Sequence, residues 1–127
     1  MNDTKHAFNE RISIVRAEDT AAAWGDEFPS AASTPFLLAQ AELASHAAVS
    51  PQLADGEITV GTTAAIEHVG ASRVGATLRT VAALQSRTGR RLRFTIEVHD
   101  GDRIVALVSH ERAIVRRSAV EAALEQS

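Results

Sequence analysis

One segment limits the possible folds of this chain more than any other. Residues 34–49 are apolar on most faces over a length that suits a helix. Thr34 is a residue that can cap the start of a helix, Pro35 suits its first turn, and Pro51 lies just past its end. A helix of ~14 mostly apolar residues spans roughly 21 Å, enough to cross a small sheet. Because such a helix must be buried, the rest of the chain has to cover it.

The sequence after Gly56 has the pattern of β-strands. Four stretches are rich in Ile, Val and Thr or alternate between apolar and polar residues: 57–69, 76–87, 92–98 and 103–116. The turn sequences Thr88-Gly89 and Asp100-Gly101-Asp102 favour hairpins and therefore antiparallel pairing. A weaker strand is predicted at 10–17, a loop or short helical turns at 19–33, and a short helix at 118–126. This order predicts one α+β domain over residues 1–127, a curved antiparallel sheet wrapped around one central helix.

Composition excludes several classes of protein. The net charge of −3 and the pI of about 5.9 argue against a nucleic-acid surface. The absence of cysteine excludes disulfides, thiolate catalysis and zinc–cysteine sites. Residues 1–6 are polar and unlike a signal peptide, and no run of 18 apolar residues predicts a membrane span. We therefore expect a cytoplasmic protein with no membrane partner, no metal and no resident cofactor.

Four polar residues stand in apolar surroundings: Thr34, Glu42, His68 and Arg112. A hydroxyl, a carboxylate, an imidazole and a guanidinium could together catalyse acyl transfer. Each residue also has a structural explanation. Thr34 could be only a helix cap, Glu42 could reach solvent, His68 could be a solvated strand end, and Arg112 could form a structural salt bridge.

The position of Arg112 predicts a polar partner for its side chain. Simple alternation places it on one strand face with Ile104, Val108 and Ile114, where an unpaired guanidinium would be costly. We expect it to meet an acid or to face a site. The other histidines of the predicted elements, His46, His99 and His110, show no comparable spacing and are interpreted as surface or structural residues.

Two further features have open interpretations. Arg87, Arg90, Arg91 and Arg93 cluster around a predicted hairpin turn, either as a solvated turn or as a landing site for a phosphorylated ligand. The loop at 19–33 carries Trp24 and Phe28, which could cover a site or only pin the loop to the core.

Several motifs occur in one order between Glu27 and Val115. They are Glu27-Phe28-Pro29, Thr34-Pro35-Phe36 with Glu42 eight residues after Thr34, Val60-Gly61-Thr62 with His68 seven residues after Gly61, Thr88-Gly89-Arg90-Arg91-Leu92, His99-Asp100-Gly101, and His110-Glu111-Arg112-Ala113. Together they resemble the fluoroacetyl-CoA thioesterase-like family of hot-dog proteins. The Thr–Glu spacing, the Gly–His spacing and the His-Glu-Arg-Ala motif carry most of the likeness.

The resemblance implies a homodimeric acyl-CoA thioesterase with sites near the dimer interface and coenzyme A as part of the substrate. It assigns catalysis to Thr34, Glu42 and His68. It also implies substrate-binding positions at Gly61 and Arg112. If the chain is such an enzyme, Phe28 would contact substrate, and Arg90, Arg91 and Arg93 would meet the CoA phosphates.

One departure from the family pattern concerns the loop before Thr34. Residues 30–33 are Ser-Ala-Ala-Ser, where a fluoroacetyl-selective lid would carry bulky apolar residues. We therefore expect a different pocket, for a small or medium acyl group, and do not transfer the fluorinated substrate. Two alternatives stay open: a hot-dog dimer that binds an acyl group or CoA without turnover, and an enoyl-CoA hydratase on the same fold.

Overall fold

The computed structural model describes residues 7–127, so the polar stretch 1–6 that argued against a signal peptide lies outside the described residues. The strands are β1 (Phe8–Ile14), β2 (Glu57–His68), β3 (Thr77–Thr88), β4 (Arg91–Asp100) and β5 (Arg103–Arg116). The α-helices are α1 (Thr34–Val49) and α2 (Arg117–Gln126), and the short 3₁₀ turns are η2 (Ala17–Asp19), η3 (Ala21–Trp24) and η4 (Ser50–Gln52).

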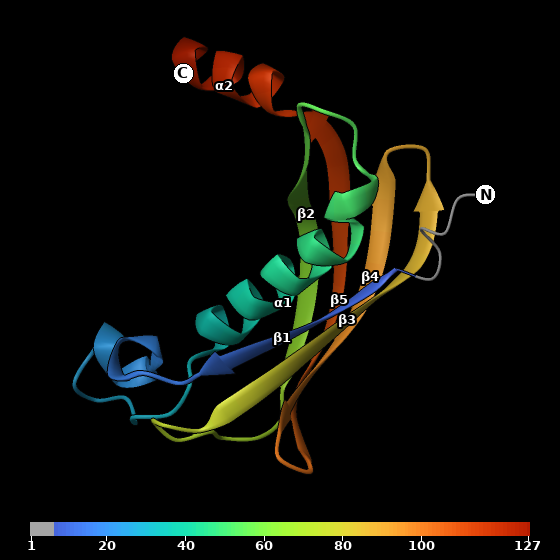
Figure 1. The fold of residues 1–127 in the computed structure, drawn as a ribbon. Coiled ribbons are helices and arrows are strands. Elements are labelled where there is room, and N and C mark those ends of the chain that lie inside the picture. The colour runs from blue at the N-terminus through green and yellow to red at the C-terminus, as the bar shows by residue number, and fades with distance from the viewer. Residues whose placement is uncertain (1–6) are drawn as a thin grey trace.

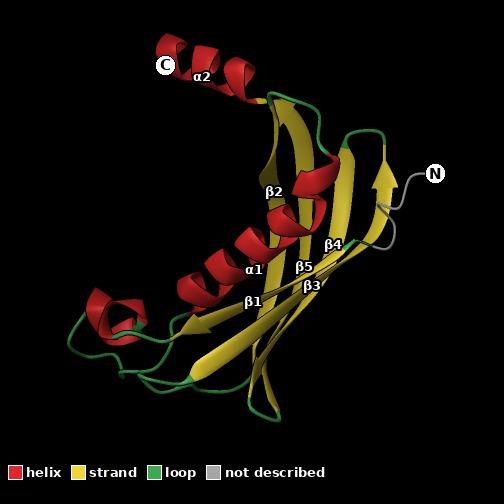
Figure 2. Ribbon diagram, viewed as in Figure 1, coloured by secondary structure: helices red, strands yellow, loops and turns green. Residues whose placement is uncertain are grey.

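Within the described residues the strands form one five-stranded sheet in the order β1-β3-β4-β5-β2, and every neighbouring pair is antiparallel. The sheet is strongly curved, and α1 crosses its concave side, whereas α2 projects away from the end of β5 (Figures 1 and 2). Gly89 and Gly101, both with φ +62°, allow the tight turns that join β3, β4 and β5. The predicted α+β architecture is therefore confirmed.

The core lies between α1 and the concave face of the sheet. Ala41, Ala44 and Ala48 of the helix pack with Phe94 and Ile96 of β4 in one buried cluster. The small alanine side chains let the helix lie close to the sheet. The opposite side of the helix is less covered than its composition predicts, because Ala39 and Leu43 are exposed in the single chain.

The start of α1 corrects the predicted cap. Ser33 is the N-cap, and its Oγ accepts a hydrogen bond from the Phe36 backbone N–H at 3.2 Å. Thr34 is instead the first helical residue, followed by Pro35. The Thr34 hydroxyl is therefore not used to satisfy the helix end and is free for another partner.

Two other strand predictions differ in detail. β1 begins and ends earlier than the predicted 10–17 strand, because the chain turns into η2 at Ala17. The predicted face-sharing of Ile104 with Arg112 is wrong. A register shift in the β4–β5 pairing near His99 interrupts the alternation, so Val105 and Ala106 are both buried while Ile104 is exposed.

The loop between β1 and α1 contains the predicted short helical turns, η2 and η3. Trp24 is 72% exposed, so it does not pin this loop to the core, and Phe28 is half exposed. Both aromatic rings stand on the surface near the start of α1.

Candidate active site

Thr34 and His68 meet at the N-terminal end of α1. Thr34 Oγ1 and His68 Nδ1 share a hydrogen bond of 2.8 Å, and both residues are exposed. The helix start supplies the hydroxyl, and the last residue of edge strand β2 supplies the imidazole. The pair therefore joins a hydroxyl to a titratable ring in a place that a ligand can reach.

Glu42 and Arg112 form a second polar group, further along the helix. Arg112 Nη1 donates to Glu42 Oε1 at 3.4 Å, so the predicted acid partner of Arg112 is Glu42. The guanidinium is buried, whereas 43% of the Glu42 side chain is exposed. In the single chain the Glu42 carboxylate is therefore partly solvated.

The Arg112 guanidinium is held mainly by Thr59 of β2. Its Nε donates to Thr59 Oγ1 at 2.7 Å and its Nη2 donates to the Thr59 carbonyl at 2.9 Å. Burial lowers the pKa of Arg112 from its ordinary value, and the Glu42 charge opposes that shift. Because two hydrogen bonds to Thr59 fix the Arg112 guanidinium, it can hold the Glu42 carboxylate in one place.

His110 completes the anchoring of Arg112. Its Nδ1 must donate to the Thr63 carbonyl at 2.7 Å, because a carbonyl oxygen only accepts. Its Nε2 can then accept from Arg112 Nη1 at 3.1 Å only while the ring is neutral. Burial lowers the pKa of His110 and Arg112 lowers it further, while the Thr63 hydrogen bond and Glu42 oppose the shift.

His46 joins the same network from α1. Thr59 Oγ1 accepts from Arg112 and shares a second hydrogen bond, of 2.7 Å, with His46 Nδ1. Burial and the Arg112 charge lower the pKa of His46. Of the two interpretations left open, surface or structural, the half-buried His46 and the buried His110 therefore fit the structural one. The i, i+2 spacing of His110 and Arg112 on one strand is the sequence signal that could have linked them.

Gly61 lies directly across the ladder from Arg112. A Cβ atom at this position would lie 3.2 Å from His110 Cε1 and 3.4 Å from both Arg112 Nη1 and Glu42 Oε1. The lack of a side chain therefore leaves room for the Glu42–Arg112 contact at the exposed edge of the sheet.

Two cavities adjoin Thr34. One, of about 450 Å³, is lined by Thr34 and His68 together with the loop residues that face them. The other, of about 260 Å³, has mostly apolar walls that include Trp24 and Phe28. Phe28, predicted to contact substrate, thus lies beside Thr34 but points into a separate hollow.

The two polar groups lie apart in one chain. Thr34 and Glu42 are separated by eight residues, about 12 Å along the helix axis. Gly61 and His68 are separated by seven residues of strand, roughly 23 Å. The structure therefore brings Thr34 to His68 and Glu42 to Arg112, but it does not bring all four together.

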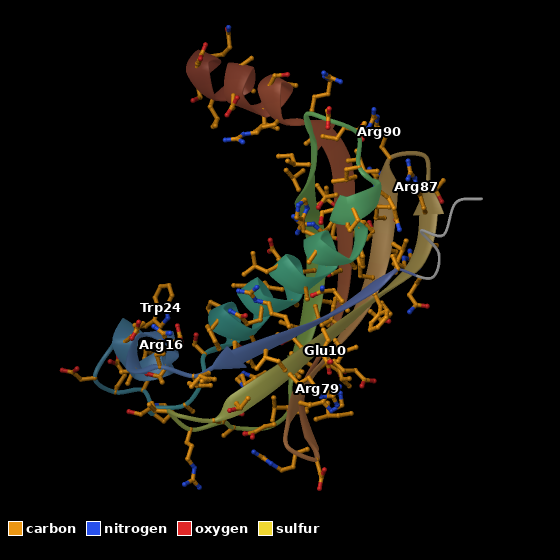
Figure 3. The ribbon with its side chains drawn as sticks, in the orientation of Figure 1. Glu10, Arg16, Trp24, Arg79, Arg87 and Arg90 are labelled. Atoms are coloured by element: carbon orange, nitrogen blue, oxygen red, sulfur yellow. The ribbon has the colours of Figure 1, made fainter. Side chains whose placement is uncertain are left out.

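Of the predicted phosphate-binding arginines, Arg90 lies at the opposite end of the sheet from Trp24 (Figure 3), and Arg91 and Arg93 follow it at the start of β4. Arg90 pairs with Glu57 at 3.1 Å, and Arg93 and Arg91 approach Glu111 at 3.4 and 3.9 Å. Each is thus close to an acid. Within the same chain they lie far from the Thr34–His68 pair.

Comparison with known proteins gives a consistent picture. The FlK family model, described as fluoroacetyl-CoA-specific thioesterase, matches residues 15–118. A fluoroacetyl-CoA thioesterase from Streptantibioticus cattleyicolor is 34% identical over 100 residues, which make up 79% of this chain and 72% of that protein. A solved variant of FlK in complex with fluoroacetate and CoA has a TM-score of 0.86 at 28% identity, covering 92% of this chain and 96% of that one.

A more distant structure supports the fold alone. A thioesterase superfamily member from Thermus thermophilus has a TM-score of 0.89 at 21% identity, covering 99% of this chain and 94% of that one. The curved sheet and its central helix therefore define a hot-dog fold. The chain belongs to the FlK family of fluoroacetyl-CoA-specific thioesterases. It is a thioester hydrolase of the acyl-CoA thioesterase type, as the sequence predicted.

Residues 7–127 hold no group of three or more His, Cys, Asp or Glu side chains placed to bind a metal ion. No helix in the same range has the length and apolar character needed to cross a membrane.

Proposed function

We propose that this protein hydrolyses small or medium acyl-CoA thioesters in the cytoplasm, as a single-domain subunit of a homodimer. The proposal rests on two polar groups that lie apart along α1. In one, Thr34 contacts His68, and in the other, Glu42 contacts Arg112. Each group has part of the chemistry of acyl transfer. Neither group is sufficient alone, so a second subunit has to unite them.

Edge strand β2 supplies the means of uniting them. It has a partner on one side only, and residues 61–65 are exposed. Antiparallel pairing of two β2 strands, with the two-fold axis between Ala64 and Ala65, would set Gly61 opposite His68 of the partner subunit. Since Glu42 lies beside Gly61, its carboxylate would face the partner's Thr34–His68 pair. The same contact would cover Leu43 and the open side of α1.

The proposed roles follow from the chemistry of each group. Glu42 acts on the thioester carbonyl, as a base toward water or as a nucleophile, with assistance from the Thr34 hydroxyl. In the water route, the water oxygen bonds to the acyl carbon, its proton passes to Glu42, and the C–S bond breaks. The His68 imidazolium stabilises or protonates the departing thiolate. Arg112 and the space left by Gly61 fix the position of Glu42.

The apolar hollow beside Thr34 is proposed to receive the acyl group. Trp24 and Phe28 line it, and its volume of about 260 Å³ suits a short chain. Its aromatic walls come from an exposed loop, so the acyl group itself would cover them.

Glu42→Gln tests the assignment of the carboxylate. The change keeps the shape and removes the charge, so neither a base nor a carboxylate nucleophile remains. We expect kcat to fall by roughly 10²–10⁴-fold, the range of a general-base contribution. Free thiol release from a panel of acyl-CoAs measures it, with enoyl-CoA hydration as a parallel assay for the hydratase alternative. Because Glu42 is partly exposed and Arg112 keeps its hydrogen bonds to Thr59, the free energy of unfolding should change by about 1 kcal/mol or less. A folded variant with wild-type kcat would remove Glu42 from the mechanism.

Mixing two inactive variants tests whether the site is shared. If Glu42 acts with His68 of the partner subunit, a heterodimer of Glu42→Gln and His68→Ala subunits contains one intact site and one doubly defective site. Random refolding together makes about half of the dimers mixed, so about a quarter of wild-type activity should return. If both residues act within one chain, every mixed site carries one defect and no activity returns. Light scattering of the wild type at micromolar concentration checks the dimer itself, and a monomer there would contradict this arrangement.

A further inference from the structure

A second hollow lies next to the cavity of Thr34 and His68. Its volume is about 310 Å³, and it shares Pro29, Ala31 and Ala71 with the first cavity. The remaining lining residues are Ser30, Ser72, Arg73, Asp100 and Arg103. A ligand that extends from the Thr34–His68 pair across this shared wall would therefore enter a basic groove.

Two arginines reach this groove from different parts of the chain. Arg103 begins β5, and its Nη2 donates to the Ala71 carbonyl at 2.9 Å and to Asp100 Oδ2 at 3.2 Å. Its guanidinium is thus held in place and paired with one carboxylate. Arg73 belongs to the segment between β2 and β3, and within residues 7–127 it makes no side-chain hydrogen bond or ion pair.

Arginine side chains elsewhere in the chain have different partners. Arg79, Arg90, Arg93 and Arg117 each pair with a carboxylate, whereas Arg11 and Arg87 donate to the Gln40 side chain and to the Gly89 carbonyl. The Arg73–Arg103 groove instead has two guanidinium groups and a single carboxylate, Asp100. It therefore has one positive charge in excess beside the candidate catalytic pair.

A buried hydroxyl lies beside the groove. Ser72 is 3% exposed, it lines the groove, and its Oγ has no hydrogen-bond partner among the described residues, as is also true of Ser13 Oγ and Thr80 Oγ1. Leaving a buried hydroxyl unpaired costs free energy, and rotation of the Ser72 side chain toward the groove would let a ligand oxygen satisfy it. An anionic oxygen would at the same time meet the two guanidinium groups, which suit phosphate geometry.

We propose that Ser72, Arg73 and Arg103 form the subsite that binds a phosphate of the CoA moiety. The inference rests on the proposed placement of the thioester at Thr34 and His68. From there the pantetheine arm runs over Ala31 and Ala71 and delivers a phosphate to the groove. The pyrophosphate and the 3′-phosphate have the same chemistry here, and the choice of substrate separates them.

The test compares one acyl group on three carriers: CoA, 3′-dephospho-CoA and pantetheine. Arg73→Ala should raise KM for the acyl-CoA by about tenfold, the factor that one charge-assisted hydrogen bond supplies, with kcat unchanged. Ser72→Ala should raise it less. KM for acyl-pantetheine, which has no phosphate, should be the same in wild type and variant. If the effect disappears with 3′-dephospho-CoA, the 3′-phosphate is the ligand, and if it persists, the pyrophosphate is.

Arg79→Ala is the matched control, because Arg79 is an exposed arginine of β3 that lines neither cavity and pairs with Glu10 of β1. It should leave all KM values unchanged. An unchanged KM for acyl-CoA in Arg73→Ala, or an equal rise for acyl-pantetheine, overturns the proposed subsite.

Calorimetric titration with 3′,5′-ADP and with CoA separates this inference from the catalytic proposal. Weaker binding of CoA to Arg73→Ala supports the groove even if Thr34 and His68 turn out not to be catalytic. Equal affinity of the wild type and Arg73→Ala for CoA overturns it even if Glu42→Gln is inactive.

Discussion

We expect His110 to make this protein less stable as the pH falls below neutrality. The ring is 1% exposed, its Nδ1 donates to the Thr63 carbonyl, and its Nε2 accepts from Arg112. Protonation of His110 at Nε2 would place the new N–H against an N–H of the buried Arg112 cation. Glu42 is the one carboxylate that favours the protonated ring, and it acts from beyond Arg112.

The magnitude follows from proton linkage. The pKa of His110 is lowered in the folded protein. Below pH 6.5, His110 therefore binds a proton in the unfolded chain but not in the folded one. The free energy of unfolding therefore falls as the pH falls from 6.5 to the lowered folded pKa, by up to about 1.4 kcal/mol per pH unit for this one group. Above pH 6.5 both states are neutral and the full stability is present.

Urea unfolding between pH 7.5 and 5.0, at one fixed protein concentration, measures this slope. The comparison variant is His110→Gln, which keeps one donor and one acceptor at the end of the side chain but does not titrate. Its stability at pH 7.5 should be lower because the geometry is less suitable, and its loss of stability toward pH 5 should be shallower than that of the wild type. Parallel pH profiles for the two proteins would refute the neutral, Arg112-bound state of His110.

Three further results are expected. Ser33→Ala should cost about 1 kcal/mol in urea unfolding, the value of an N-cap hydroxyl, and a change near zero would contradict the observed cap. Thr34→Val and His68→Ala should each lower kcat for acyl-CoA less than Glu42→Gln does, and a larger loss for either would make that residue, rather than Glu42, the principal group. Neutralising Arg90, Arg91 and Arg93 together should raise KM for acyl-CoA more than it lowers kcat. The reason is that the two-fold arrangement proposed above brings this end of one subunit toward the partner's cavity. An unchanged KM at low salt would exclude these arginines from CoA binding.

The sequence predicted the architecture well because its signals are local. The apolar run of α1 and the strict alternation of β4 needed no knowledge of distant residues, and the glycine turns set the antiparallel order. The helix cap was misplaced by one residue because serine and threonine cap equally well in principle. The face of Ile104 was wrong because a register shift leaves no mark in a pattern of alternating residues.

The site was predicted in part for a similar reason. Thr34 and His68 contact each other, and the acid expected near Arg112 is Glu42, whereas the catalytic roles of these residues stay predictions. The role of Thr59 as the main support of Arg112 was not predicted, because a threonine in a strand is unremarkable in sequence. The distance between the two polar groups is a property of the helix packed on the sheet, and only coordinates give it.

The order of the strands has a consequence for how the chain acquires its structure. β3, β4 and β5 are joined by short turns, whereas β1 pairs with β3 across some seventy residues of sequence and β2 pairs with β5 through contacts such as Glu57 with Arg116. Local hairpins close quickly and distant pairings slowly. During synthesis β2 leaves the ribosome roughly 2–10 s before β5 is complete, at 5–20 residues per second. β1 can pair once β3 has been made, whereas β2 waits unpaired until β5 is complete, so the edge that carries Gly61 and His68 is among the last parts of the sheet to form.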